Sequence, residues 1–148
     1  MTRHVLLRPR SRKPSPKASM YRDLARFRYR LRLFLRFSEN SARSSGVTPQ
    51  QHQLLLGIAG HTGERSSTVS ELAEFLQERH NSVVGLIDRA ARRGLVRKQK
   101  DTKDKRVVFV SLTARGENIL SKLSKLHEEE IRRMRTGFLF NKPGAKRG

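Results

Sequence analysis

The segment Thr68–Thr113 constrains the fold of this chain more than any other part. It opens with Thr68-Val69-Ser70-Glu71, which has the Thr-x-x-Glu form of a helix capping box. Apolar residues at helical spacing predict a short helix to about residue 77 and, after a tight turn, a second helix over residues 80–93. Gly94 suits the left-handed conformation that commonly follows a helix. Two short helices that share one apolar core are therefore expected.

Two strands are predicted directly after these helices, over residues 95–99 and 106–112. The second is rich in β-branched and aromatic residues, which favour strands. Residues 100–105 between them are too polar to pack and form the tip of a hairpin. Helix, turn, helix and hairpin make the pattern of a winged helix-turn-helix. The predicted fold class is thus mostly α with a small β-hairpin, flanked by long helices.

The charge balance indicates the kind of partner. Lys and Arg total 33 against 13 Asp and Glu, which gives a formal net charge of +20. Such an excess favours a polyanion, and nucleic acid first. No segment approaches the roughly 18 consecutive apolar residues of a membrane-spanning helix, so no membrane partner is expected. The chain has no cysteine, which excludes disulfides, thiolate metal sites and a cysteine-based peroxide sensor.

Much of this charge lies on the predicted second helix and hairpin, since residues 79–106 hold ten Lys or Arg and three acids. Polar side chains at the helix start can donate and accept toward base edges in a major groove about 12 Å wide. The alternative for His80 and Asn81 is helix capping and solvation. The candidate base-contacting residues are His80, Asn81, Ser82, Val84, Gly85 and Arg89. The candidate phosphate contacts are Thr68, Ser70, Arg79, Arg92 and Arg93, where interaction with the helix dipole is the alternative for Arg92 and Arg93.

The hairpin tip is a second candidate contact with nucleic acid, through Lys103, Asp104, Lys105 and Arg106. A thin basic loop can enter the narrow minor groove, where arginine is favoured by the strong negative potential. Asp104 lies two residues before Arg106, so on an extended strand both project to one side and the carboxylate can brace the guanidinium. The alternative is a solvated turn with an incidental ion pair.

The flanking segments have helical periods that suit dimerisation. The helix predicted over residues 20–44 is apolar over more than one stripe, which fits either cover on two sides, by the core and a partner subunit, or simple core burial. We expect a disordered basic arm (1–19), one domain (20–136) with a DNA-binding part (about 48–113) and dimerisation helices (about 20–44 and 113–136), and a basic tail (137–148).

The combined motifs resemble the MarR family of bacterial winged-helix regulators. The resemblance is carried by Leu72-Ala73, Leu86-Ile87-Asp88-Arg89, Arg93-Gly94-Leu95-Val96, Asp101-x-x-Asp104-x-Arg106 and Val110-Ser111-Leu112-Thr113-x-x-Gly116. It implies a homodimer that binds palindromic double-stranded DNA and usually represses transcription. It also implies that Arg106 is the minor-groove arginine and Asp104 its support. The chain departs from the family pattern at Arg79, where Ser or Thr is frequent, at Gly85, where a basic residue is common, and after residue 136, where a further helix is usual.

The resemblance also implies a small phenolic or other lipophilic effector. Family members often bind such acids between the dimerisation and DNA-binding parts, and Arg36, Phe37 and His52 could line such a cleft. Ordinary packing and surface charge are the alternative for these three residues. No cofactor or metal is expected.

An enzyme is not expected, because the sequence has no glycine-rich phosphate loop and its five histidines are scattered without a consistent partner. The alternative to a sequence-specific regulator is a non-specific architectural DNA-binding or RNA-binding basic protein, which the charge would serve equally well. The expected location is the bacterial cytoplasm, in association with the nucleoid.

Overall fold

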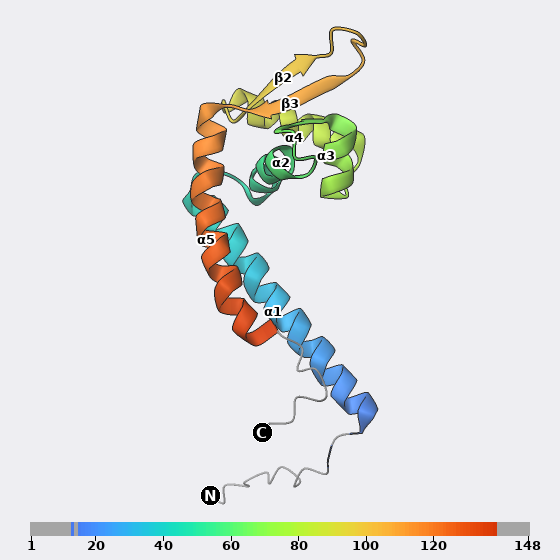
Figure 1. Ribbon diagram of the computed structural model, residues 1–148, viewed down its shortest axis with the longest axis vertical. Helices are drawn as coiled ribbons and strands as arrows, with labels where there is room; N and C mark the ends of the chain where they lie inside the picture. The colour runs from blue at the N-terminus through green and yellow to red at the C-terminus, as the bar shows by residue number, and fades with distance from the viewer. Residues whose placement is uncertain (1–12, 14, 139–148) are drawn as a thin grey trace, which may run out of the picture.

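The computed structural model describes residue 13 and residues 15–138 (Figure 1). The elements follow in the order α1 (Pro16–Ser44), α2 (Pro49–Gly60), β1 (Ser66–Thr68), α3 (Val69–Leu76), α4 (His80–Arg92), β2 (Val96–Lys100), β3 (Val108–Leu112) and α5 (Ala114–Phe138). Helices α1 and α5 form an elongated stalk, and the elements between them pack into a compact head (Figure 1). The predicted class, mostly helical with a small antiparallel sheet, is confirmed.

Helix α1 begins four residues earlier than predicted. The side chain of Ser15 accepts a hydrogen bond from the N–H of Ala18 at 3.2 Å, and Pro16 occupies the first turn, where it needs no N–H partner. Residues 16–19, expected in the disordered arm, are therefore helical, and α5 likewise continues two residues into the predicted tail. The rest of the predicted arm, apart from residues 13 and 15, and residues 139–148 lie outside the described residues.

Both capping boxes form as predicted. The hydroxyl of Thr48 accepts from the N–H of Gln51 at 3.1 Å, and the N–H of Thr48 donates to the Gln51 side chain at 3.1 Å. The hydroxyl of Thr68 accepts from the N–H of Glu71 at 3.2 Å, and the N–H of Thr68 donates to the Glu71 carboxylate at 2.8 Å. Each box satisfies two otherwise unpaired donors, so the starts of α2 and α3 are set by residues three apart in the sequence.

The sheet has three antiparallel strands in the order β1-β3-β2, where only two had been predicted. Strand β1 was missed because Ser66-Ser67-Thr68 is short, polar and without apolar alternation. It exists by pairing with β3, with Ser67 opposite Val110. Strand β3 begins at Val108 rather than at the predicted residue 106.

The core lies in the head and continues into the start of α5. Every element except β1 places at least one apolar residue in it, and the largest fully buried apolar side chains are Leu54, Leu55, Ile58, Leu72, Ile87, Leu95, Leu123, Val83 and Val110. Burial of each such side chain stabilises the fold by roughly 1.5–3 kcal/mol. One core therefore fixes α4 and the hairpin relative to each other. Among the described helices, none combines the length and apolarity needed to cross a bilayer.

A tight junction joins the hairpin to α5. The N–H of Thr113 donates to the carbonyl of Leu95 at 3.1 Å, and the Thr113 hydroxyl donates to the carbonyl of Gly94. The same hydroxyl accepts from the N–H of Gly116 at 3.1 Å, which caps α5. The end of α4, the start of β2 and the start of α5 thus meet at one point.

Candidate nucleic-acid interface

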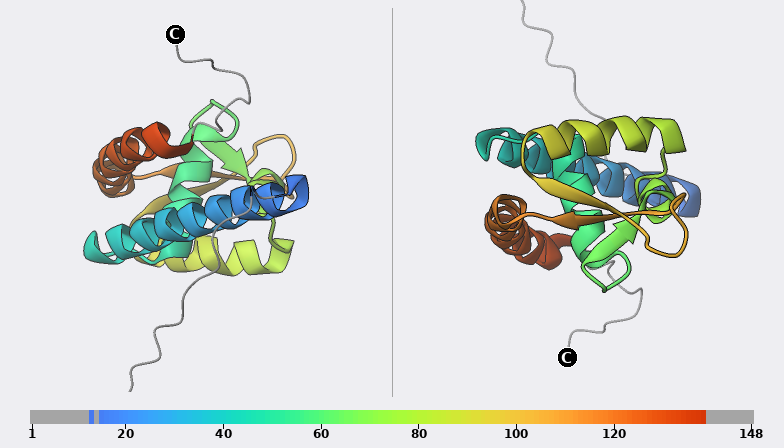
Figure 2. Two further views of the ribbon diagram at one scale, coloured as in Figure 1. Left: turned by 90° about the horizontal axis from the view of Figure 1, so that it is seen from below. Right: turned by 90° about the horizontal axis from the view of Figure 1, so that it is seen from above.

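Helix α4 has one buried and one exposed side. Val83, Leu86, Ile87 and Ala90 are buried in the core at helical spacing. The side away from them carries exposed polar and basic side chains. Seen from above, α4 and the β2–β3 hairpin both lie across the surface (Figure 2, right).

The candidate base-contacting residues on α4 are accessible. His80, Asn81, Ser82, Val84 and Arg89 are exposed, and Gly85 is half-buried. Arg79 is the N-cap residue of α4, but its side chain makes no capping hydrogen bond. The first-turn N–H groups of α4 therefore have no side-chain acceptor and are available to an anion at the positive end of the helix dipole.

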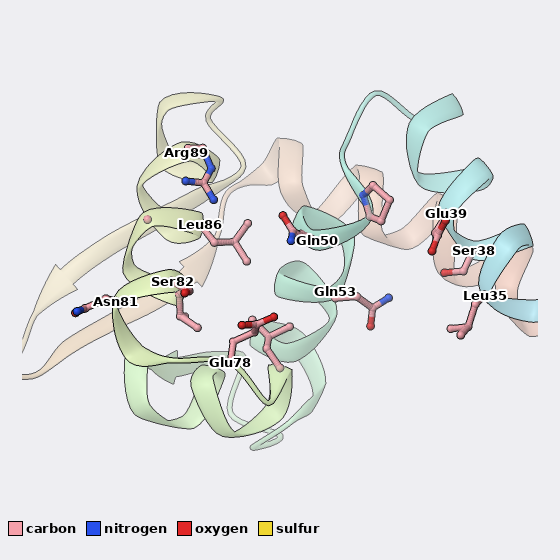
Figure 3. Close-up of a pocket in the computed structure, with 14 residues that line it drawn as sticks. Leu35, Ser38, Glu39, Gln50, Gln53, Glu78, Asn81, Ser82, Leu86 and Arg89 are labelled. Atoms are coloured by element: carbon pink, nitrogen blue, oxygen red, sulfur yellow. The ribbon is translucent and has the colours of Figure 1, made fainter. Parts of the chain in front are cut away.

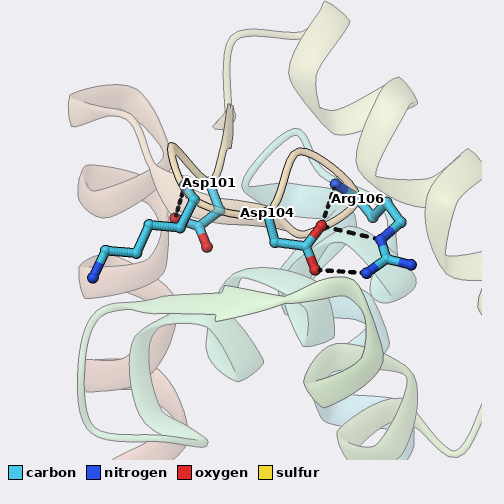
Figure 4. Close-up of polar contacts among 4 residues, drawn as sticks. Asp101, Asp104 and Arg106 are labelled. Atoms are coloured by element: carbon cyan, nitrogen blue, oxygen red, sulfur yellow. Dashed lines mark hydrogen bonds and ion pairs between the residues drawn. The ribbon is translucent and has the colours of Figure 1, made fainter.

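The hairpin tip holds Arg106 in a defined orientation while leaving it accessible. Its Nε donates to Oδ1 of Asp104 at 3.1 Å, and a terminal guanidinium nitrogen donates to Oδ2 at 3.3 Å (Figure 4). The Arg106 side chain is 92% exposed. The hydrogen bonds from Arg106, first from its side chain and then from its backbone, lower the pKa of Asp104, so the pair stays charged at neutral pH.

The geometry of this pair differs from the predicted extended strand. Asp104 and Arg106 lie in a turn, in which the N–H of Arg106 donates to Oδ1 of Asp104 at 3.1 Å and the N–H of Val107 donates to the Asp104 carbonyl at 3.0 Å. Asp101 accepts from the N–H of Lys103 at 3.4 Å in the same i to i+2 pattern. Aspartate side chains commonly close turns in this way. The two aspartates thus shape the tip, between the exposed side chains of Lys103 and Lys105.

The candidate phosphate contacts divide into two groups. Ser70, Arg79 and Arg92 are exposed, whereas the hydroxyl of half-buried Thr68 serves as the N-cap of α3. Arg93 is engaged elsewhere, because its guanidinium donates to Oε1 of Gln51 at 2.8 Å and to the carbonyl of Gly46. Arg93 therefore ties the end of α4 to the start of α2.

A salt bridge that was not predicted from the sequence joins α4 to β2. Nζ of Lys98 lies 2.6 Å from Oδ1 of Asp88. The hydrogen bond from Lys98 holds the pKa of Asp88 below its ordinary value, with a further contribution from the charge of Arg92. Strand alternation could have indicated this contact. Lys98 lies two residues after buried Val96, so both side chains lie on the same side of β2.

The three predicted effector residues differ in their surroundings. Arg36 is exposed on α1, while Phe37 and buried His52 both contact the ring of His127, at centroid distances of 5.3 and 4.8 Å. His127 hydrogen-bonds to the carbonyl of Leu123 at 2.7 Å and to the Ser38 hydroxyl at 2.8 Å, within the packing of α1 against α5. The view of the histidines as scattered without partners was wrong for His52 and His127.

Burial determines the charge state of His52. Desolvation, followed by repulsion from His127, lowers the pKa of His52 to about 4. Its imidazole is therefore neutral at physiological pH.

A cleft borders α4 between α1, α2 and α4 (Figure 3). It measures about 590 Å³ and contains neither Arg36, Phe37 nor His52. Its walls include Gln50 and Gln53 from α2 and Leu35, Ser38 and Glu39 from α1; its α4 wall includes Asn81, Ser82, Gly85, Leu86 and Arg89. Four candidate base-contacting residues therefore border this cleft. Within residues 13 and 15–138, no cluster of three or more His, Cys, Asp or Glu side chains is placed to hold a metal.

The fold and this surface together define a winged helix-turn-helix protein. Residues 45–107 match the model of the MarR family. A stretch of 77 residues is 35% identical to the HTH-type transcriptional repressor MdtR of Bacillus subtilis (strain 168) and spans 52% of this chain and 48% of that protein, about half the length of the relative.

Solved structures extend the likeness to the whole fold. The chain superimposes on AbsC, a MarR family transcriptional regulator from Streptomyces coelicolor, with a TM-score of 0.70 and 20% identity, over 90% of this chain and 88% of AbsC. It superimposes on a mutant MarR from E. coli, complexed with operator DNA, with a TM-score of 0.64 and 20% identity, over 86% and 89% of the two chains. The match to the family model over residues 45–107 and the shared fold agree with the resemblance to the MarR family that the motifs had suggested.

Proposed function

We propose that this chain is a transcriptional regulator that binds double-stranded DNA sequence-specifically as a homodimer. The observation that carries the proposal is the wing arginine. Arg106 is 92% exposed, yet three hydrogen bonds to Asp104 fix its direction. An exposed arginine gains little for folding from such bracing. A preoriented guanidinium at the tip of a thin hairpin suits insertion into a minor groove.

The proposed binding mode follows from the arrangement of the head. Helix α4, the recognition helix, enters the major groove with its exposed side. The β2–β3 hairpin, the wing, enters the adjacent minor groove. Base contacts come from His80, Asn81, Ser82, Val84, Gly85 and Arg89, and wing contacts from Lys103, Asp104, Lys105 and Arg106. Phosphate contacts come from Thr68, Ser70, Arg79 and Arg92, while Arg93 positions α4. The E. coli MarR mutant whose structure contains operator DNA shares this fold, which supports the mode.

The homodimer is supported by apolar surface on the stalk. The exposed large apolar side chains there are Met20, Tyr21, Leu24, Phe27, Tyr29, Leu33, Leu35, Leu126 and Ile131. A surface of this kind marks an interface, and a second copy of the stalk is the proposed cover. Residues 20–44 and 113–136 would then be the dimerisation helices and residues 48–113 the DNA-binding part. A two-fold dimer implies a palindromic operator.

The proposed regulatory outcome is repression relieved by a small lipophilic or phenolic effector. MdtR, which is 35% identical over 77 residues, is a transcriptional repressor. The cleft between α1, α2 and α4 is the proposed effector site, in place of Arg36, Phe37 and His52, because it borders the recognition helix directly. The protein acts in the bacterial cytoplasm on the nucleoid, without enzymatic activity.

Sequence preference tests this function against the architectural alternative. Bound duplexes are selected from a random pool, and the enriched palindrome is then competed against a random duplex and an RNA of equal length at one salt concentration. The palindrome should compete at least 100-fold better, since specific binding typically exceeds non-specific binding by roughly a thousand-fold or more. Equal competition by all three nucleic acids would mean that the protein is a non-specific binder.

A further inference from the structure

Asp88 is a carboxylate on the surface that the proposed function directs toward DNA. It follows Asn81 by seven residues and precedes Arg92 by four, so the three side chains lie on one face of α4. A negative charge there opposes the phosphate backbone. Simple electrostatics therefore predicts that removal of this charge would strengthen binding to any DNA.

The salt bridge from β2 changes this expectation. Lys98 Nζ lies 2.6 Å from Asp88 Oδ1, and the Lys98 and Asp88 side chains are 46% and 37% exposed. The pair is the hydrogen-bonded side-chain link between α4 and β2 in the described part of the chain. Lys98 also lies opposite Val110 of β3 in the antiparallel pairing of β2 with β3. The pair therefore fixes the recognition helix against the strand that leads to the wing tip.

We propose that Asp88 and Lys98 form a positioning pair that sets the spacing between the recognition helix and the wing. The pair thereby determines whether α4 and Arg106 reach the major and minor grooves of one site together. Lys98 acts through Asp88 and not as a phosphate contact. This inference rests on the proposed function, because it assigns a specificity role within that same interface.

The direction in which one substitution changes operator affinity separates a positioning role from an effect of charge alone. Asp88→Asn keeps the size of the side chain and removes its negative charge. Positioning predicts that Asp88→Asn weakens operator binding about three- to ten-fold, as expected for loss of one coupled pair, while affinity for random duplex stays equal or rises. Charge alone predicts tighter binding to both duplexes.

Lysine variants supply the second measurement. Lys98→Met should weaken operator binding without a change in the salt slope, whereas loss of a phosphate-contacting lysine lowers that slope by about one. Lys100→Met is the matched control, since Lys100 is exposed on the same strand and side but has no ion partner among the described residues. The double variant Asp88→Asn/Lys98→Met should bind operator no more weakly than Lys98→Met alone. Lys98→Arg, which keeps the positive charge, should bind operator as the wild type does. Thermal unfolding of each variant checks that the fold is intact.

The outcomes distinguish this inference from the function on which it rests. If wild-type protein prefers its operator and Asp88→Asn binds that operator equally or more tightly, the positioning role is refuted and the regulator function stands. A lower salt slope for Lys98→Met would make Lys98 a phosphate contact and refute it as well. If wild-type protein shows no preference for any duplex, both proposals fail.

Discussion

Two glycine-to-alanine substitutions should change stability in opposite directions. Alanine is favoured over glycine by up to about 1 kcal/mol within a helix. A Cβ on Gly85 of α4 would have one near neighbour, the end of the flexible Arg89 side chain at 3.3 Å. A Cβ on Gly116 of α5 would lie closer than 3.0 Å to the carbonyl oxygen of Leu95 and 3.1 Å from its carbonyl carbon. The neighbour that must move is a side-chain tip in one case and backbone in the other.

The magnitudes follow from this difference. Gly85→Ala should raise the free energy of unfolding by about 0.5–1 kcal/mol, which is the helix-propensity gain alone. Gly116→Ala should lower it by about 1–3 kcal/mol, because overpacking exceeds that gain. The Leu95 carbonyl cannot withdraw cheaply, since it accepts the hydrogen bond of Thr113 at the junction of hairpin and α5.

Equilibrium unfolding in urea at one fixed protein concentration measures both variants. The midpoints of the two should differ by about 0.5 M or more, given slopes of about 1–3 kcal/mol per M for small proteins. Unchanged slopes would confirm that native and unfolded states keep their compactness. If Gly116→Ala is as stable as Gly85→Ala, the close approach of α5 to Leu95 is not as described.

Three further outcomes are expected. Arg106→Ala should weaken operator binding by about 1–3 kcal/mol with an unchanged unfolding midpoint, because the side chain is 92% exposed; unchanged affinity in a binding titration would remove the wing from the interface. Arg92→Met should weaken DNA binding without a change in the free energy of unfolding. Arg93→Met should lower the free energy of unfolding in urea by about 1–2 kcal/mol, because its hydrogen bonds to Gln51 and Gly46 are lost. The reverse pattern would contradict these assignments. In the folded chain the pKa of His52 is about 4, so its imidazole stays neutral at pH values below 6.5, where the unfolded histidine binds a proton. Between pH 6.5 and pH 4 the free energy of unfolding should therefore fall by about 3 kcal/mol more in the wild type than in His52→Gln. Parallel pH profiles of the two proteins would refute this.

The wing shows how far a local pattern predicts a site. Asp104 and Arg106 were paired from their spacing, and the structure brings them together. The reason differs from the one predicted, because an aspartate-closed turn and not an extended strand aligns them. Both explanations depend on residues two apart, so the pairing was predictable although its backbone conformation was not.

Arg93 shows where local pattern is insufficient. Arg92 and Arg93 are adjacent basic residues at the end of one helix, and the sequence offers no basis for distinguishing them. Only the packing of α2 against α4 brings Gln51 and Gly46 within reach of one guanidinium, which leaves Arg92 exposed. The contacts of Phe37 and His52 with His127 of α5 depend on tertiary packing in the same way.

The sequence by itself determined the helices, both capping boxes, the basic hairpin and the family motifs. These features depend on periodicity and on hydrogen bonds between residues only a few positions apart, so they are encoded locally. The tertiary structure decided the pairing of β1 with β3, the Asp88–Lys98 salt bridge, the clamp by Arg93 and the burial of His52 against His127. Each of these joins separate elements, and its geometry is fixed only when one shared core sets the distances between them.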